Sequence, residues 1–94
     1  MTREIIVSIL EGEGAEAGPG GLAIREDREA TCFIATPAEI MHVARIVRVE
    51  LKDKFLVLQT AKDERFSFAY EAVLGFKLAT AQHPRDRAAG FGSR

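Results

Sequence analysis

Short apolar runs with alternating side chains, separated by polar turns, recur along this chain of 94 residues. The alternation is strictest in residues 65–70, where three aromatic side chains alternate with Ser67 and Ala69. Such runs predict half-buried β-strands, and their spacing of roughly eight to twelve residues is typical of antiparallel sheets that curl. We therefore expect a mainly β domain, a small antiparallel barrel or half-barrel of about five to six short strands.

The expected strands are separated by turns rich in charged residues. The strand segments are residues 3–10, 21–25, 30–36, 45–51, 55–60 and 65–70. The polar turns between them include residues 26–29, 52–54 and 61–64. Since a single turn separates 22–25 from 30–36, we expect these two segments to pair as a hairpin.

One segment, TPAEIMHVA (residues 36–44), carries the signals of a helix start. Thr36 can cap the helix, Pro37 suits the first helical position, and Glu39 completes a capping box. The apolar residues that follow recur at helical spacing. We expect one short capped helix over about 37–44, placed across an open end of the sheet.

Residues 71–81 are compatible with two structures. The first is a single helical turn at 71–74, a break at Gly75 and a strand at 76–79; the second is one helix over 71–81. Gly75 disfavours the second, since glycine inside a helix costs roughly 1 kcal/mol. Residues 83–94 contain almost no apolar side chains, so we expect a mobile polar tail there and a single domain over residues 1–82.

The stretch EGEGAEAGPGG (residues 11–21) holds five of the eight glycines. Glycine-rich turns bind phosphate when their N–H groups converge on the anion, usually beside a helix N-terminus and a lysine. This stretch carries three glutamates and no basic residue, and a strand-like segment follows it. Its charge argues against a nucleotide site, so we expect a flexible acidic loop between the first two strands.

Charge and cysteine content restrict the classes of protein further. The net charge of −1 is divided unevenly, with three basic and eight acidic residues in 1–40 against ten and six in 41–94. Such a division suits a basic binding face, or two complementary faces that attract each other. The apolar runs are too short to span a membrane. Cys32, the single cysteine, lies among apolar neighbours, which predicts a buried side chain and favours a reducing cytoplasm.

The residues that catalysis requires are scarce in this chain. It has two histidines, His42 and His83, and none of the motifs that hold zinc or activate a nucleophile. Glu39 and His42 would share a face of the expected helix, but no second pair of ligands accompanies them. We therefore expect no metal site, no cofactor and no enzymatic activity.

Four basic and three aromatic residues form the one candidate face for nucleic acid or a protein partner. They are Arg45, Arg48, Lys52, Lys54, Phe66, Phe68 and Tyr70. Exposed rings beside cations would suit single-stranded nucleic acid, which needs surfaces for base stacking and positive charge along its backbone. A domain without tryptophan also needs phenylalanine in its core, and strict alternation is equally typical of a core face. Both interpretations stay open, although a sequence pI of about 6.1 disfavours a dedicated nucleic-acid binder.

The segment VRVELKDK (residues 47–54) resembles the first strand pair of Sm-like RNA-binding barrels, in which a V-x-V-x-L-K stretch precedes a turn. The resemblance is confined to this part of the chain. Lys54 stands where that family has a glycine, and no second motif follows, so we transfer no function from it.

These features predict a small cytoplasmic binding or regulatory domain without enzymatic activity. It would act through protein–protein contacts or self-association, and exposed strand edges together with a small core favour a homodimer. The alternative function is a single-stranded nucleic-acid-binding module that uses the basic strand and the adjacent aromatic residues.

Overall fold

The structure, a computed structural model, describes residues 1–81. Its elements are α1 (Arg3–Gly12), β1 (Glu16–Gly18), β2 (Gly21–Ala23), β3 (Arg28–Ala35), β4 (Ile40–Leu51), β5 (Phe55–Thr60), β6 (Arg65–Ala69), the 3-10 turn η1 (Tyr70–Ala72) and β7 (Val73–Thr80). The tail expected at 83–94 lies outside the described residues.

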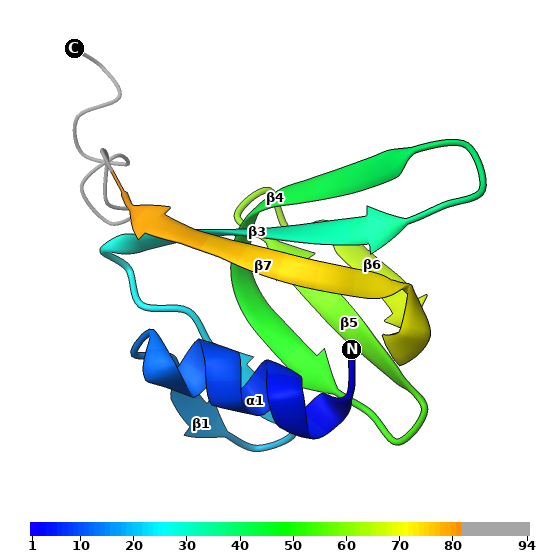
Figure 1. Ribbon diagram of the computed structural model, residues 1–94. Helices are drawn as coiled ribbons and strands as arrows, with labels where there is room; N and C mark the ends of the chain where they lie inside the picture. Colours follow the sequence, from blue (N-terminus) through cyan, green and yellow to red (C-terminus); the bar gives the residue numbers. More distant parts are fainter. Residues whose placement is uncertain (82–94) are drawn as a thin grey trace, which may run out of the picture.

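The strands form one antiparallel sheet that curls into a half-barrel (Figure 1). Its five longer strands stand in the order β7-β3-β4-β5-β6, and β2 and β1 continue the sheet beside the second half of β4. The expected mainly β half-barrel is confirmed. The sheet has seven strands because two three-residue strands, β1 and β2, join the longer ones.

The long strand β4 connects the parts of the sheet. β2 and β3 lie end to end along one of its edges, and β5 pairs with the other edge. The hairpin expected between 22–25 and 30–36 is therefore wrong: these segments pair with β4 and not with each other, because β4 is long enough for both. Its register shifts on both edges close to Arg45, whose φ of 58° is left-handed. Figure 1 shows β4 curving strongly, so that the sheet closes partway around the core.

Residues 3–10 form a helix and not the expected strand. Thr2 caps this helix, since its Oγ1 accepts a hydrogen bond of 3.2 Å from the N–H of Ile5. Ile6 and Leu10, four residues apart, are completely buried. The β-branched residues of the segment favour a strand only weakly, so the burial of one helical face decides its structure.

The short helix expected over 37–44 is also wrong, because β4 begins at Ile40. The same capping residues make a turn: Oγ1 of Thr36 accepts a hydrogen bond of 3.0 Å from the N–H of Glu39, and the N–H of Thr36 donates one of 3.0 Å to the Glu39 carbonyl. A helix cap and this turn share the bond from a threonine hydroxyl to an N–H three residues later. Pairing of the next residues with β3 selects the strand.

The glycine-rich stretch 11–21 is not simply a loop between two strands. Its first two residues end α1, and its second half belongs to the hairpin β1–β2. Gly20 in the turn has a φ of 77°, a conformation that favours glycine. A Cβ on Gly21 would lie 2.3 Å from the carbonyl oxygen of Val49, so glycine is needed for β2 to approach β4 this closely.

Of the two structures considered for 71–81, the strand is correct and the helix is wrong. The helical turn η1 stands one residue earlier than expected, at Tyr70–Ala72, and β7 follows it directly. The strands expected at 45–51, 55–60 and 65–70 are confirmed as the second half of β4, β5 and β6. In β3, Cys32 and Ile34 face the core while Thr31 and Phe33 face outward, as the alternation predicts.

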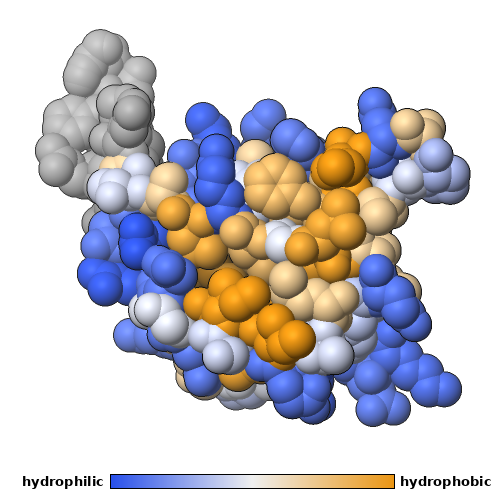
Figure 2. Space-filling model, in the orientation of Figure 1, coloured by the Kyte–Doolittle hydropathy of each residue, from blue (hydrophilic) through white to orange (hydrophobic). Residues whose placement is uncertain are grey.

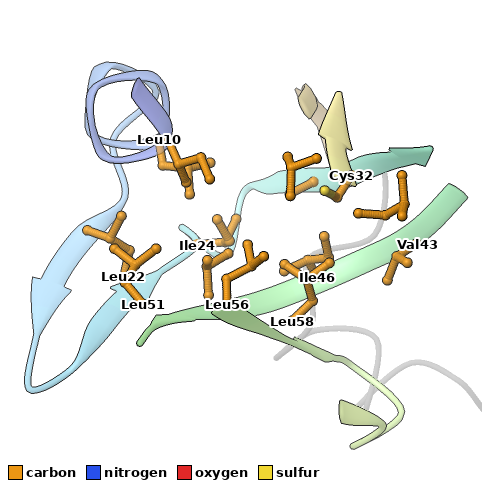
Figure 3. Close-up of a cluster of buried hydrophobic side chains, with 14 residues drawn as sticks. Leu10, Leu22, Ile24, Cys32, Val43, Ile46, Leu51, Leu56 and Leu58 are labelled. Atoms are coloured by element: carbon orange, nitrogen blue, oxygen red, sulfur yellow. The ribbon is translucent and has the colours of Figure 1, made fainter. Parts of the chain in front are cut away.

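The core lies between α1 and the inner face of the half-barrel (Figure 3). Figure 3 shows Leu10 of α1 close to Leu22 and Ile24, while Ile46 and Leu58 fill the space below Cys32. The buried cluster consists of Ile6, Leu10, Leu22, Ile24, Ala30, Cys32, Ile34, Val43, Ile46, Val49, Leu51, Leu56, Leu58 and Val73. Members of this cluster come from α1 and from five of the strands, so one core unites the described residues.

Replacement of a core leucine should cost far more stability than replacement of an exposed one. Leu58 is 0% exposed and Leu74 is 49% exposed. Leu58→Ala should lower the free energy of unfolding by about 3 kcal/mol, because it removes buried contacts and leaves a cavity. Leu74→Ala, the matched control, should change it by less than about 0.5 kcal/mol. Urea denaturation measures both, and equal losses would contradict this placement of the core.

Cys32 should be inert to thiol reagents in the folded protein. It is completely buried, and this burial raises the pKa of its thiol to about 12. At mildly alkaline pH the folded protein should therefore react with a chromogenic disulfide reagent much more slowly than the urea-unfolded protein, which serves as the control. Immediate stoichiometric labelling without urea would show that Cys32 is accessible.

Candidate interaction surface

The cations of the predicted binding face lie on β4 and in the turn after it, and most contact other parts of the chain. Nη2 of Arg48 donates a hydrogen bond of 2.7 Å to the carbonyl oxygen of Pro19 and so holds the β1–β2 turn. Nε of Arg45 lies 3.5 Å from Oε2 of Glu29, in an exposed ion pair. Lys54 is exposed in the turn between β4 and β5.

Lys52, Glu50 and Arg65 form an ion-pair cluster on the outer face of the sheet, opposite the core. Arg65 on β6 donates hydrogen bonds of 2.8 and 3.0 Å to the Glu50 carboxylate on β4, and Nζ of Lys52 lies 3.5 Å from that carboxylate. Since β5 runs between these strands, the Arg65 side chain reaches across it beside Val57, which faces outward yet is only 4% exposed. The Arg65 guanidinium lowers the pKa of Glu50, against the opposing effect of burial.

The three aromatic residues of the predicted face pack against the core. Phe66 and Phe68 are half-buried, stand opposite two buried leucines of β5, and stack with their ring centroids 6.5 Å apart. The hydroxyl of Tyr70 donates a hydrogen bond of 2.5 Å to the carbonyl oxygen of Lys52, and burial raises the pKa of Tyr70. Their contacts therefore join β6 and η1 to the core and to the β4–β5 turn.

The structure does not bring the predicted cations and aromatic rings onto one face. Arg48 points outward, since side chains alternate along a strand and its neighbour Val49 is buried in the core. Phe66 and Phe68 point inward, towards the core side of the same sheet. A stacking platform for single-stranded nucleic acid needs both groups on one exposed face, so this geometry gives that function little support.

The residues considered for a metal site lie apart in the described part of the chain. Within residues 1–81 no three His, Cys, Asp or Glu side chains are grouped in a way that could hold a metal ion. Glu39 lies in a turn and His42 on β4, so they share no helix face. The His42 ring meets the Phe33 ring edge to face, with centroids 4.8 Å apart and an interplanar angle of 83°.

No helix within residues 1–81 is long and apolar enough to cross a membrane.

Apolar side chains gather on one face of the molecule. Figure 2 shows them over α1, the start of β7 and the β3–β4 hairpin, with hydrophilic side chains around them. The large apolar residues of these elements that are most exposed are Ile5 at 49%, Ile40 at 56% and Leu74 at 49%. Leu74 is the extra residue of a β-bulge, since β3 pairs with its neighbours Val73 and Gly75. We call these exposed side chains of α1, β7 and the hairpin the apolar surface.

One strand edge on the hairpin has no partner within the described part of the chain. β4 pairs with β3 from Ile40 onward, whereas β5 pairs with the other edge of β4 only from Ile46. The intervening residues 40–44 form what we call the free edge. Figure 1 shows the β3–β4 hairpin projecting beyond the rest of the sheet.

Comparison of the chain with protein-family models, curated proteins and solved structures finds no match. The proposed role of the apolar surface and of the free edge therefore rests on their geometry.

The sequence patterns did not predict the free edge or the pairing of Glu50 with Arg65. A signal for the edge was present, since IMHVA (residues 40–44) is an uncharged run between Glu39 and Arg45. The pairing across β5 has no local signal, because it depends on the register of three strands.

The contribution of Glu50 to stability should depend on pH. Its pKa in the folded protein lies below the ordinary value of 4.5, so the carboxylate stabilises the fold above that pH, and the effect is lost as the pH falls through the folded-state pKa. Glu50→Gln should therefore lower the melting temperature at pH 7 by a few degrees at most, as expected for a surface pair. In strong acid, the melting temperatures of Glu50→Gln and of the unmodified protein should be equal.

Thermal denaturation monitored by circular dichroism at several pH values measures this effect. Glu71→Gln is the matched control, because the exposed Glu71 forms no ion pair with any of residues 1–81. An equal loss for Glu50→Gln at pH 7 and in strong acid would contradict an electrostatic role.

Proposed function

We propose that this protein is a small, non-enzymatic binding domain that acts through protein–protein contacts. The apolar surface is the observation that carries the proposal. Ile5, Ile40 and Leu74 are each about half exposed, and Figure 2 shows apolar side chains gathered over α1, the start of β7 and the β3–β4 hairpin. Contiguous exposed apolar side chains rimmed by polar residues are typical of protein interaction sites.

Burial by a partner would stabilise a complex at this surface. Each square ångström of apolar surface removed from water contributes about 25 cal/mol, and no segment of the described part covers these three side chains. The charged residues that surround the apolar surface would stay in water at the rim of such an interface.

A cytoplasmic location belongs to the same proposal. The single cysteine is free and buried, and it contributes to the core without a disulfide. A domain that depends on packing alone and carries one reduced thiol suits a reducing compartment.

Site-specific photo-crosslinking tests the proposal. A benzophenone amino acid placed at Ile5 or at Leu74 in the full chain, expressed in its native cells, should give discrete adducts that contain a second polypeptide. Lys62 and Ser67, exposed on the β5–β6 turn and on β6, are the control positions and should give few. Adducts that disappear on nuclease treatment would favour nucleic-acid binding instead. Equal labelling at all four positions, or none, would contradict a protein-binding role for the apolar surface.

A further inference from the structure

The backbone groups of the free edge point away from the rest of the sheet. The N–H of Thr36 donates to the Glu39 carbonyl across the β3–β4 turn, and hydrogen-bonded pairs then alternate along the hairpin. Within residues 40–44, the residues that bond to β3 are therefore Met41 and Val43. The N–H and C=O groups of Ile40, His42 and Ala44 face outward, and no hydrogen bond within residues 1–81 satisfies them.

The other edges of the sheet are protected from pairing with another chain. β1 is only three residues long, β6 is five residues long and ends in the helical turn η1, and β7 carries Lys77 and a bulge at Leu74. Short strands, charges and bulges are the usual means by which proteins prevent edge pairing. The free edge has neither a bulge nor a Lys, Arg, Asp or Glu side chain, since residues 40–44 are extended and β4 becomes irregular only at Arg45.

We propose that the free edge pairs antiparallel with the free edge of a second copy of this chain, with His42 opposite His42 of the second copy. This inference rests on the proposed function, action through protein–protein contacts, and adds a second contact site and its partner. Outward N–H and C=O groups of identical segments complement one another about a two-fold axis, which makes the same patch both halves of the interface.

The charges at the two ends of the free edge select this partner and this register. With His42 at the two-fold axis, Glu39 of each copy comes opposite Arg45 of the other. Opposite charges therefore lie at both ends of the pairing, and the residues between them include no Lys, Arg, Asp or Glu. A parallel arrangement would place Glu39 beside Glu39 and Arg45 beside Arg45, which like-charge repulsion disfavours.

The side chains on both faces of the new strand pair are also compatible. On the core side, Met41 of one copy would meet Val43 of the other, and both residues already belong to or pack against the apolar core. On the outer side, Ile40, which is 56% exposed, would lie opposite Ala44. Apolar cross-strand pairs of this kind stabilise antiparallel sheets, so the two half-barrels would share one continuous sheet.

Charge exchange tests the register. In sedimentation velocity at micromolar concentrations, the full chain should behave as a dimer. Glu39→Arg and Arg45→Glu should each weaken dimerisation by about tenfold or more, because each puts like charges opposite each other. The double variant should regain most of the lost affinity, which a structural role of either residue would not produce. Circular dichroism should show that all variants are folded.

Cysteine crosslinking locates the two-fold axis. His42→Cys places two thiols on opposite strands at the separation of directly paired residues, about 5.5 Å between Cα atoms, which a disulfide can span. Under mild oxidation this variant should form a covalent dimer. Ser67→Cys on β6, equally exposed, should not. The native Cys32 is completely buried and does not compete.

The outcomes separate this inference from the broader proposal. A monomeric wild-type protein at micromolar concentrations, or a double charge variant no stronger than the single variants, overturns pairing through the free edge. Crosslinking at Ile5 and Leu74 is independent of it, since neither residue lies in the free edge. If no discrete adducts form at Ile5 and Leu74, the protein-binding function of the apolar surface is overturned instead.

Discussion

The fold depends on the bend of β4 at Arg45. β4 pairs with β3 along its first half and with β5 along its second half. A straight strand could not form both pairings while β3 and β5 curl around the same core. The register shifts on each edge and the left-handed φ of 58° at Arg45 allow the change of direction. A residue other than glycine in this conformation costs about 1–2 kcal/mol, and the pairing of β2, β3 and β5 with one strand offsets that cost.

The same bend creates the free edge that we propose for pairing with a second copy. Because β4 turns away from β5 at Arg45, its first residues extend past the end of β5 and leave the free edge unpaired. The hairpin is held in shape by Thr36, whose side chain and backbone both bond to Glu39. A projecting edge without Lys, Arg, Asp or Glu is thus a direct result of the geometry that closes the half-barrel.

Sequence patterns predicted those elements whose structure is determined locally. The alternation in 65–70 and in 55–60 identified strands correctly, since one buried face was enough to impose a period of two residues. Residues 3–10 were misassigned because their β-branched side chains alternate, whereas the buried pair Ile6 and Leu10 follows helical spacing. The capping signal at Thr36 was genuine as a hydrogen bond, but whether a helix or a strand follows it depends on β3. Contacts that depend on register, such as Glu50 with Arg65, could not be inferred before the strand order was known.

The pairing of β3 with β7 has a consequence for how the chain folds. Its other long strands, β3 to β6, form successive hairpins, in which each strand pairs with the next one in the sequence. β7 must return across this whole meander to reach β3, so of all the strand pairings this one carries the largest entropic cost of loop closure. The hairpins can therefore form early, but the core gains the buried Val73 and the partly buried Phe76 and Leu78 only when β7 arrives. Of the strands within residues 1–81, β7 is synthesised last, and its pairing with β3 adds the final residues to the core of this part of the chain.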